Sequence, residues 1–598
     1  MTLTHEPLRI LLSEVLLKCI KKQLADVAVD SETVTLVDIY KSLVDPPNVA
    51  LGHLAFGCFI TAKHLKKAPP QVAQILAADI QKEISENKKL ANEVSSVEAA
   101  GPYLNIKFSS ETLFKLVIAP IISGETFKTK LTIDTPKMMI EYSQPNTHKE
   151  LHVGHMRNMC LGDAIVKLLR YSNYDILSAT FPGDVGTHVA KCLWYMKFHN
   201  TEKAPATHKG EWLGAMYSKG NLKLEDEENT PQGEINKKTL TEILKQLESK
   251  SGEYFDLWKE TRQWSIDLMN DVYKWAGIEF DQWYFESDVD SASVKTIKKY
   301  FTEGKLQESQ GAIGLDFETD KLGFCLLLKS DGTGLYATKD IELARRKFED
   351  FEIEKSVYIV DQRQALHFKQ VFKALEHLGF EQAKNCFHLQ YNYVELPDGA
   401  MSSRKGNIVP LTKLVSTMKN HIQENYLKRY EKEWSADEID LVSEQVAKGA
   451  IKYGMLKQDT NKKIVFEMNE WTKLDGESGP FIQYSYARIN SLVKKLNYNV
   501  SDKTDGKLLN HASELQLMQH LMNFNTVVLS AAESYKPASV CTYLYDTAKK
   551  FNNFYHDCPI GTADTADLKA ARLALAYATG CVIKQGLALI GIPVPERM

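Results

Sequence analysis

The fold of this chain is decided by one stretch, Glu141-Tyr142-Ser143-Gln144-Pro145-Asn146-Thr147-His148-Lys149-Glu150-Leu151-His152-Val153-Gly154-His155. The residues before it, 137–140, form a short apolar segment that predicts a strand, and apolar side chains in residues 156–169 recur at helical spacing. A strand that turns directly into a helix presents backbone N–H groups and the positive end of the helix dipole to an anion. Gly154 has no side chain, so a planar base can approach the backbone there. The stretch is therefore typical of a site that holds a nucleoside triphosphate.

Strand-like and helix-like segments alternate from about residue 126 to residue 435, for example at residues 175–180 and 356–360. This alternation predicts a parallel sheet with crossover helices, in which ligands bind at the carboxyl ends of the strands. Both His152 and Gln364 follow strand candidates, as that rule requires. The polar residues 201–240 are interpreted as a solvated insertion and not a site.

The two ends of the chain have other patterns. Residues 1–125 predict a small α/β domain with helices at about residues 55–65 and 70–86, and residues 436–598 predict an all-helical domain that includes a long helix at residues 568–589. We therefore expect an α/β multidomain protein. A parallel-sheet domain over residues 126–435 is flanked by the small N-terminal α/β domain and a C-terminal helical bundle.

Composition narrows the class of protein. The 598 residues are 44% hydrophobic and 25% charged, which is ordinary for soluble globular proteins. The net charge of −4 neither supports nor excludes RNA binding, which needs only a basic face. Nine scattered cysteines without a Cys-x-x-Cys pair make a zinc knuckle unexpected and fit reduced thiols in a cytosolic protein. Neither a signal peptide nor a membrane span is expected, because the apolar run at residues 8–20 is broken by charges.

A second signal lies far downstream, in the loop Met401-Ser402-Ser403-Arg404-Lys405-Gly406-Asn407. A basic, hydroxyl-bearing loop can form a second clamp on phosphates. In this order, the two stretches resemble the "HIGH" and "KMSKS" signature motifs of class I aminoacyl-tRNA synthetases. The pattern Ser-x-Pro-Asn-x-x-Lys-x-x-His-x-Gly-His, the segment 183–188 and the ending at residues 586–598 most resemble the arginyl-tRNA synthetase family, over nearly the whole chain.

The resemblance implies an arginine–tRNA ligase with a Rossmann-type catalytic domain. Such an enzyme activates arginine with ATP to arginyl-adenylate and transfers it to the 3′ end of tRNA(Arg), releasing AMP and pyrophosphate, in protein synthesis. It also implies a cytoplasmic monomer that uses Mg²⁺ with ATP and has no bound zinc. The alternatives are another class I synthetase, of the cysteinyl or glutamyl type, and a synthetase-like protein that binds tRNA without catalysis.

The resemblance assigns the ATP site to both motifs. His152, Gly154 and His155 contact ATP together with Met401, Ser402 and Ser403. The usual lysines of the second motif are replaced by Ala400 and Ser403, so we hypothesise that Lys149 supplies the missing charge while Arg404 and Lys405 hold pyrophosphate. A metal site formed by His148, His152 and His155 is the alternative, but no carboxylate at metal-ligand spacing completes that set.

A pocket for arginine needs carboxylates, because the guanidinium group is a planar cation with five donors. By resemblance, Glu141, Tyr336 and Asp340 surround the guanidinium, while Ser143, Asn146 and Gln364 lie near the α-amino and carboxylate groups. The alternative for Asp340 is a surface ion pair with Lys339 or Arg345 on the same helix.

The family also contacts RNA outside the catalytic domain. The resemblance places Tyr103 and Asn105 of the N-terminal domain at the tRNA elbow. It places Phe481, Tyr555 and the terminal Met598 around the anticodon loop, where unstacked bases are read by aromatic stacking and edge hydrogen bonds. Each of these side chains could instead be part of a domain core.

Overall fold

A five-stranded parallel sheet positions the site. The structure, a computed structural model, describes residues 7–48, 50–396, 399–400, 409–499 and 504–598. The strand order is β12-β11-β5-β6-β7, and every neighbouring pair is parallel. The strands are β5 (Met138–Glu141), β6 (Ile176–Thr180), β7 (Gln282–Trp283), β11 (Lys355–Asp361) and β12 (Cys386–Tyr391). The expected parallel sheet is thus confirmed, and its order reverses between β5 and β11, which is where such sheets bind ligands.

The central strands are buried because both of their faces are covered. All four residues of β5 are buried, as are the middle five of β11. Met139 and Ala179 pack against Leu343 and Phe348 of α14 (Tyr336–Phe351). The continuous apolar runs seen in the sequence are explained by this packing, since a strand with one solvated face would alternate instead.

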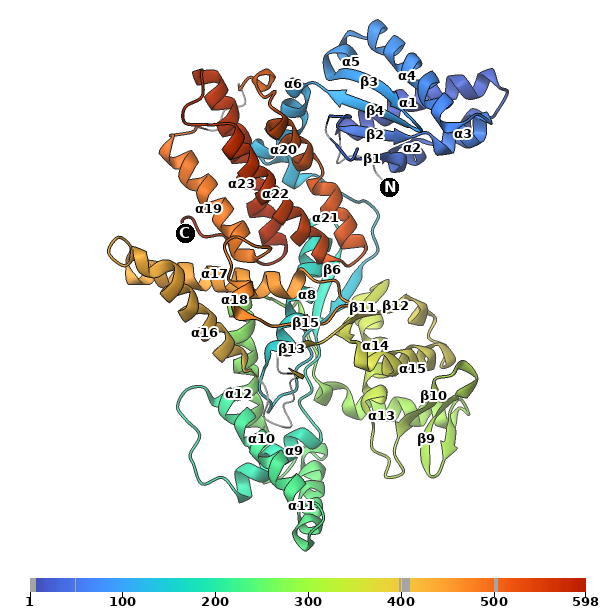
Figure 1. Ribbon diagram of the computed structural model, residues 1–598. Coiled ribbons are helices and arrows are strands. Elements are labelled where there is room, and N and C mark those ends of the chain that lie inside the picture. The colour runs from blue at the N-terminus through green and yellow to red at the C-terminus, as the bar shows by residue number, and fades with distance from the viewer. Residues whose placement is uncertain (1–6, 49, 397–398, 401–408, 500–503) are drawn as a thin grey trace. The chain divides into compact units, whose positions relative to one another are not determined.

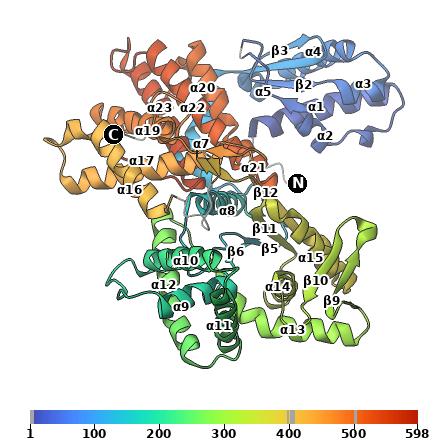
Figure 2. The same cartoon turned by 60° about the horizontal axis from the view of Figure 1, so that its bottom comes forward.

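Helical and antiparallel segments are inserted between the strands. Figures 1 and 2 show α9–α12 gathered as one group beside the sheet and α13–α15 as another. The helices are α8 (Val153–Tyr171), α9 (Thr187–Phe198), α10 (Lys209–Asp226), α11 (Pro231–Glu248), α12 (Glu253–Ala276), α13 (Glu286–Thr302) and α15 (Ala365–His377). A three-stranded antiparallel sheet, β8 (Gln307–Ser309), β9 (Ala312–Phe317) and β10 (Gly323–Leu328), shares a core with α13, α14 and α15.

Contacts divide the chain into two compact units. We call residues 135–170 and 174–472 the sheet-bearing unit, and residues 1–134, 171–173 and 473–598 the terminal unit. The sheet-bearing unit ends with β13 (Val394–Leu396), β14 (Gly399–Ala400), α16 (Leu411–Ile422), α17 (Ala436–Leu456), β15 (Ile464–Val465) and α18 (Met468–Trp471). It therefore includes α17, which the sequence analysis assigned to the helical domain. The reason is tertiary: Lys452 of α17 is fully buried 3.3 Å from Asp163 of α8.

The terminal unit contains both ends of the chain. Its first part has a four-stranded antiparallel sheet of order β1-β2-β4-β3. The elements are α1 (Pro7–Asp26), α2 (Leu36–Ser42), β1 (Leu43–Val44), β2 (Leu54–Gly57), α3 (Phe59–Leu65), α4 (Pro69–Glu86), α5 (Lys88–Glu93), β3 (Val94–Ala100), β4 (Tyr103–Phe108), α6 (Ser110–Leu113) and α7 (Ala119–Ser123). Its last part is helical: α19 (Gly479–Lys495), α20 (Ala512–Met522), α21 (Phe524–Glu533), α22 (Pro537–Asp557) and α23 (Ala566–Leu589).

Local predictions in the terminal unit had different outcomes. The helix expected at 70–86 is confirmed as α4, which begins with proline at its first turn, and the long helix expected at 568–589 is confirmed as α23. The helix expected at 55–65 is wrong over residues 55–58. Residues 54–57 form β2 instead, because they pair with both β1 and β4, and the helix begins only at Phe59.

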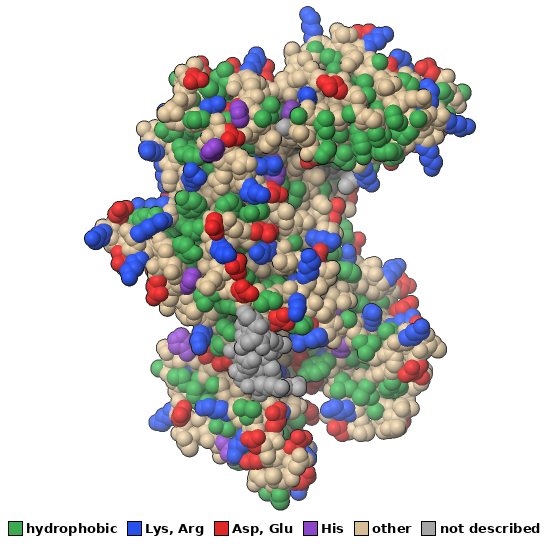
Figure 3. Space-filling model, viewed as in Figure 1, with side chains coloured by type: hydrophobic (Ala, Val, Ile, Leu, Met, Phe, Trp, Pro, Cys, Tyr) green, Lys and Arg blue, Asp and Glu red, His purple; other side chains and the backbone are tan. Residues whose placement is uncertain are grey.

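The surface shown in Figure 3 carries acidic and basic side chains interspersed over both units, which agrees with the small net charge. None of the described helices combines the length and apolar composition that a bilayer crossing requires.

Candidate active site

Two histidines with adjacent rings lie where α8 begins. The imidazole rings of His152 and His155 are 3.9 Å apart between centroids and inclined at 32°. The backbone N–H of His152 donates to Nδ1 of His155, and the backbone N–H of Gly154 donates to Nδ1 of His152, each at 3.1 Å. Since both Nδ1 atoms accept, we assign the neutral tautomer with its proton on Nε2 to each ring.

Both rings are held neutral by their surroundings. Burial lowers the pKa of His152 to about 4, with a smaller contribution from the positive charges of Arg363 and Lys149. Burial likewise lowers the pKa of His155 well below its usual 6.5. Two neutral Nε2–H donors at the start of a helix can donate to phosphate oxygens without a proton transfer.

A cavity of about 600 Å³ opens at the carboxyl ends of β5 and β11. It lies within the sheet-bearing unit and brings together residues from the first motif, from α14 and from the turn after β11. Ten residues that the sequence analysis named line it: Glu141, Ser143, Asn146, Lys149, His152, Gly154, His155, Tyr336, Asp340 and Gln364.

One end of this cavity is acidic. Asp340 of α14 accepts a hydrogen bond from Nε2 of His367 at 2.5 Å. The surface pairs considered for Asp340 are not seen, because Lys339 pairs with Glu286 at 2.8 Å and Arg345 pairs with Glu342 at 2.9 Å. Asp340 therefore belongs to the cavity wall and not to a helix-surface ion pair.

The second acid of this end, Glu141, is the last residue of β5. One carboxylate oxygen accepts from Nε2 of Gln144 at 3.1 Å, and the other pairs with the fully buried Lys347. The neighbouring Ser143 is fixed by α8, since its backbone N–H donates to Oδ1 of Asn158 at 2.5 Å. Asn158 in turn donates to the carbonyl of Ile359 in β11 at 2.8 Å, so the loop is tied to the sheet.

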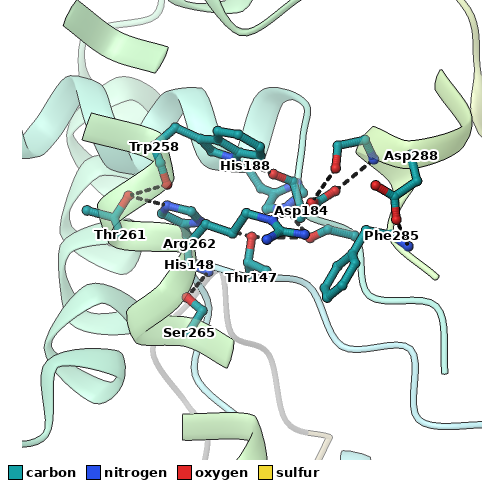
Figure 4. Close-up of polar contacts among 12 residues, drawn as sticks. Thr147, His148, Asp184, His188, Trp258, Thr261, Arg262, Ser265, Phe285 and Asp288 are labelled. Carbon is teal, nitrogen blue, oxygen red and sulfur yellow. Dashed lines mark hydrogen bonds and ion pairs between the residues drawn. The ribbon is translucent and has the colours of Figure 1, made fainter. Parts of the chain in front are cut away.

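A buried polar network supports the middle of the first motif (Figure 4). His148 is fully buried, has a left-handed backbone (φ 59°), and bonds through its two ring nitrogens to Thr147 at 2.9 Å and Thr261 of α12 at 2.8 Å. Its backbone N–H donates to the hydroxyl of Ser265 at 2.9 Å. His148 is thus anchored to α12 and not grouped with His152 and His155 as a metal set.

The same view shows Asp184 at the centre of a second cluster. Its carboxylate accepts from Nε of Arg262 at 2.6 Å and from the hydroxyl of Ser287 at 2.6 Å. The guanidinium of Arg262 also lies 4.0 Å from the ring centroid of Phe285. This cluster joins the segment 183–188 to α12 and to the start of α13, and so fixes the wall of the cavity near Asn146.

Lys149 lies beside the segment that was interpreted as a solvated insertion. Its ammonium is 5.1 Å from the ring centroid of Tyr217 in α10, and a second cavity of about 270 Å³ is lined by Lys149, Tyr217, Asn221 and Glu225, among others. The interpretation as a solvated insertion is therefore corrected. Helix α10 buries Leu213, Met216 and Tyr217 against Cys192.

The chain is similar to known proteins along nearly its whole length. A family model described as "tRNA synthetases class I (R), catalytic domain" matches residues 118–468, more than half of the chain. The chain belongs to the arginyl-tRNA synthetase family. The models "Arginyl tRNA synthetase N terminal domain" and "DALR anticodon binding domain" match residues 14–108 and 482–598.

Relatives support this membership along the full length. An arginine–tRNA ligase of Bdellovibrio bacteriovorus is 61% identical over 594 residues, which are 99% of this chain and 100% of that protein. One from Treponema denticola is 33% identical and covers 92% of this chain and 94% of its own. In fold, the chain is similar to the arginyl-tRNA synthetase of Thermus thermophilus, with a TM-score of 0.79 at 24% identity, over 99% of this chain and 100% of that chain.

The positions that this family implies for RNA contact lie in the terminal unit. Tyr103 is 38% exposed at the start of β4, with its ring edge-on to Phe59, whereas Asn105 on the same strand is buried. Both side chains point to the same face of the sheet, because they are two residues apart on the strand, and Tyr103 lies at its exposed end.

In the helical part, the ring of Phe481 lies 5.5 Å from that of Tyr545, and the guanidinium of Arg488 lies 4.2 Å from the ring centroid of Tyr555. Met598 is half-buried. The second motif, with Met401, Ser402, Ser403, Arg404 and Lys405, lies outside the described residues.

The sequence analysis did not predict several residues of this site. His367, Lys347, Thr261 and Asp184 carry hydrogen bonds or charges that hold the predicted residues in place. Asp184 lies in the quoted segment 183–188 and could have been found there. The others have no local signal, because each partner is distant in the sequence.

Proposed function

We propose that this chain joins arginine to tRNA(Arg) in two steps. Arginine and ATP first form arginyl-adenylate and pyrophosphate, and the terminal ribose hydroxyl of the tRNA then takes the arginyl group and releases AMP. One observation carries the proposal: the cavity at the switch point of the sheet is lined by neutral histidine donors beside a helix start and by two carboxylates.

At the histidine end, the reaction needs positioning and charge stabilisation more than acid–base chemistry, because a carboxylate attacks a phosphate and both are negative. His152 and His155 donate from Nε2 to phosphate oxygens, and Gly154 leaves room for the adenine base beside the backbone. Lys149 adds the positive charge that the second motif lacks. Mg²⁺ arrives with ATP and is held mainly by phosphate oxygens.

At the acidic end, Glu141 and Asp340 accept hydrogen bonds from the guanidinium group, and Tyr336 covers it. Ser143, Asn146 and Gln364 hold the α-amino and carboxylate groups. Two carboxylates suit a planar, permanently charged fork better than a lysine ammonium or a neutral side chain. The cysteinyl and glutamyl alternatives are disfavoured, because an acid-lined cavity matches neither a thiol nor a carboxylate.

For the tRNA, we propose the three domains expected from the sequence, 1–125, 126–435 and 436–598, of which the last contributes α17 to the sheet-bearing unit. Tyr103 and Asn105 contact the elbow, and Phe481, Tyr555 and Met598 contact the anticodon loop.

The loop of the second motif acts on ATP: Met401, Ser402 and Ser403 contact ATP, while Arg404 and Lys405 hold pyrophosphate. The chain acts in the cytoplasm as a monomer.

The test is ATP–pyrophosphate exchange with each amino acid, with and without tRNA, followed by charging of tRNA. We expect exchange and charging with arginine and with no other amino acid. Exchange with cysteine or glutamate would assign another class I synthetase, and tRNA binding without any exchange would assign a protein that binds tRNA without catalysis.

A further inference from the structure

Lys347 is a fully buried cation close to the acidic end of the cavity. It belongs to α14, the helix that also carries Asp340 seven residues earlier, about two turns away. Its side chain has no exposed surface, its ammonium pairs with Glu141, and it lies 3.9 Å from the ring centroid of Tyr358. A buried lysine is costly to desolvate, so its presence here calls for a physical reason.

The ion pair is held from three elements at the switch point of the sheet. Glu141 and Tyr358 are register neighbours on β5 and β11, and Lys347 reaches both of them from α14. The backbone of Glu141 is fixed on its other side as well, because it is paired with Ala179 of β6. The backbone of Glu141 is therefore fixed, and its carboxylate is held by Lys347 and Gln144.

The two carboxylate oxygens of Glu141 face different surroundings. The oxygen Oε2 pairs with Lys347, which is not among the residues that line the cavity. The oxygen Oε1 accepts from Nε2 of Gln144, which does line the cavity. Lys347 thus binds the carboxylate from behind and leaves the other oxygen on the side where a ligand enters.

We propose that Lys347 is a positioning residue that holds the carboxylate of Glu141 and directs its second oxygen toward the cationic side chain of the amino-acid substrate. This inference rests on the proposed function, since it deepens the assignment of Glu141 to the guanidinium site. Without the ammonium the carboxylate is no longer held in one orientation, so its charge-assisted hydrogen bond to a cationic ligand is weakened. Lys347 would therefore determine how strongly the site prefers arginine to citrulline, its neutral isostere.

The experiment compares arginine with citrulline on the full-length chain. Lys347→Met is expected to weaken arginine binding, measured by calorimetry, by about 10- to 100-fold, because a charge-assisted hydrogen bond is lost. The affinity for citrulline and the KM for ATP should stay within about twofold of the unaltered chain. The KM for arginine in tRNA charging should rise with the dissociation constant, and Lys347→Arg should restore most of the loss because it keeps the cation.

A matched control is available in the same unit. Lys452→Met also removes a fully buried lysine from a carboxylate, Asp163, which keeps Lys167 as a partner at 2.6 Å and does not line the cavity. It is expected to lower the thermal midpoint without changing the ratio of arginine to citrulline affinity. Equal loss of both ligands in Lys347→Met, or an unchanged arginine affinity, would overturn the proposal.

A double variant keeps the test decisive if Lys347→Met does not fold. Glu141→Gln with Lys347→Met removes both charges and leaves no uncompensated ion in the interior. If Lys347 acts only through Glu141, this double variant has the same arginine-to-citrulline ratio as Glu141→Gln alone. A further drop would refute the inference. Failure of the unaltered chain to charge tRNA with arginine would instead refute the proposed function.

Discussion

His148 should make the folded protein sensitive to acid. Its imidazole is fully buried between Thr147 and Thr261, and burial, with a smaller effect from the charge of Arg262, lowers its pKa to about 3 from 6.5. The test is His148→Asn, because asparagine tolerates the left-handed backbone (φ 59°) that the position requires and does not titrate.

The magnitude follows from the two pKa values. Near pH 5.5 the imidazole of the unfolded chain is protonated while that of the folded chain is not, so the unfolded state binds more protons. The free energy of unfolding therefore falls as the pH drops below 6.5. One pH unit below the unfolded pKa, this loss is about 1.4 kcal/mol. At pH 8 the loss is close to zero. Asparagine is too short to reach Thr261, so the variant is expected to be about 1–3 kcal/mol less stable at pH 8.

The assay is urea unfolding of both chains near pH 8 and pH 5.5. The stability gap between them should narrow by about 1.4 kcal/mol on acidification, because only the unaltered chain pays the protonation penalty. A gap that stays constant or widens would mean that the folded protein binds the proton, and the reasoning from burial would be wrong. Thr261→Val is the control. This variant breaks the same network but leaves the imidazole in place. The difference in free energy of unfolding between it and the unaltered chain should therefore change little with pH.

Four further predictions concern the cavity. Asp340→Asn should raise the KM for arginine by about 10- to 100-fold and leave the KM for ATP unchanged, because a charge-assisted hydrogen bond to the guanidinium is lost; equal changes in both constants would remove Asp340 from the arginine site. Burial alone would lower the pKa of His367, but the hydrogen bond and charge of Asp340 outweigh it and raise that pKa above 6.5. Protonated His367 competes for Asp340, so the KM for arginine should fall as the pH rises through the raised pKa, and His367→Gln should flatten this profile. Gly183→Ala places a Cβ 2.4 Å from Oδ1 of Asn146, so kcat/KM for arginine should drop by about 10-fold or more. An unchanged kcat/KM would show that Asn146 can move without affecting the site. Lys149→Met should slow pyrophosphate exchange strongly while calorimetry still detects arginine, and a near-normal exchange rate would contradict the role of Lys149.

The first motif could be located from the sequence because its signals are local. A short apolar strand, a turn and a helical period are properties of neighbouring residues, and they place His152 and Gly154 at the start of α8. The ten predicted residues that line the cavity follow from this motif and from the family pattern. The start of the helix expected at 55–65 failed for the opposite reason, because pairing with β4 on another segment made it a strand.

Local patterns predicted the alternating sheet domain, the family and the residues that meet at the end of β5, since periodicity and motif spacing are properties of neighbouring residues. The partners that hold the charged and titratable side chains of the site come from folding. Lys347 and Glu141 are 206 residues apart, and His148 and Thr261 are 113 apart. Which acid receives a buried cation, and which histidine is kept neutral, depends on desolvation and on partners brought together by folding, and no local pattern records either of them.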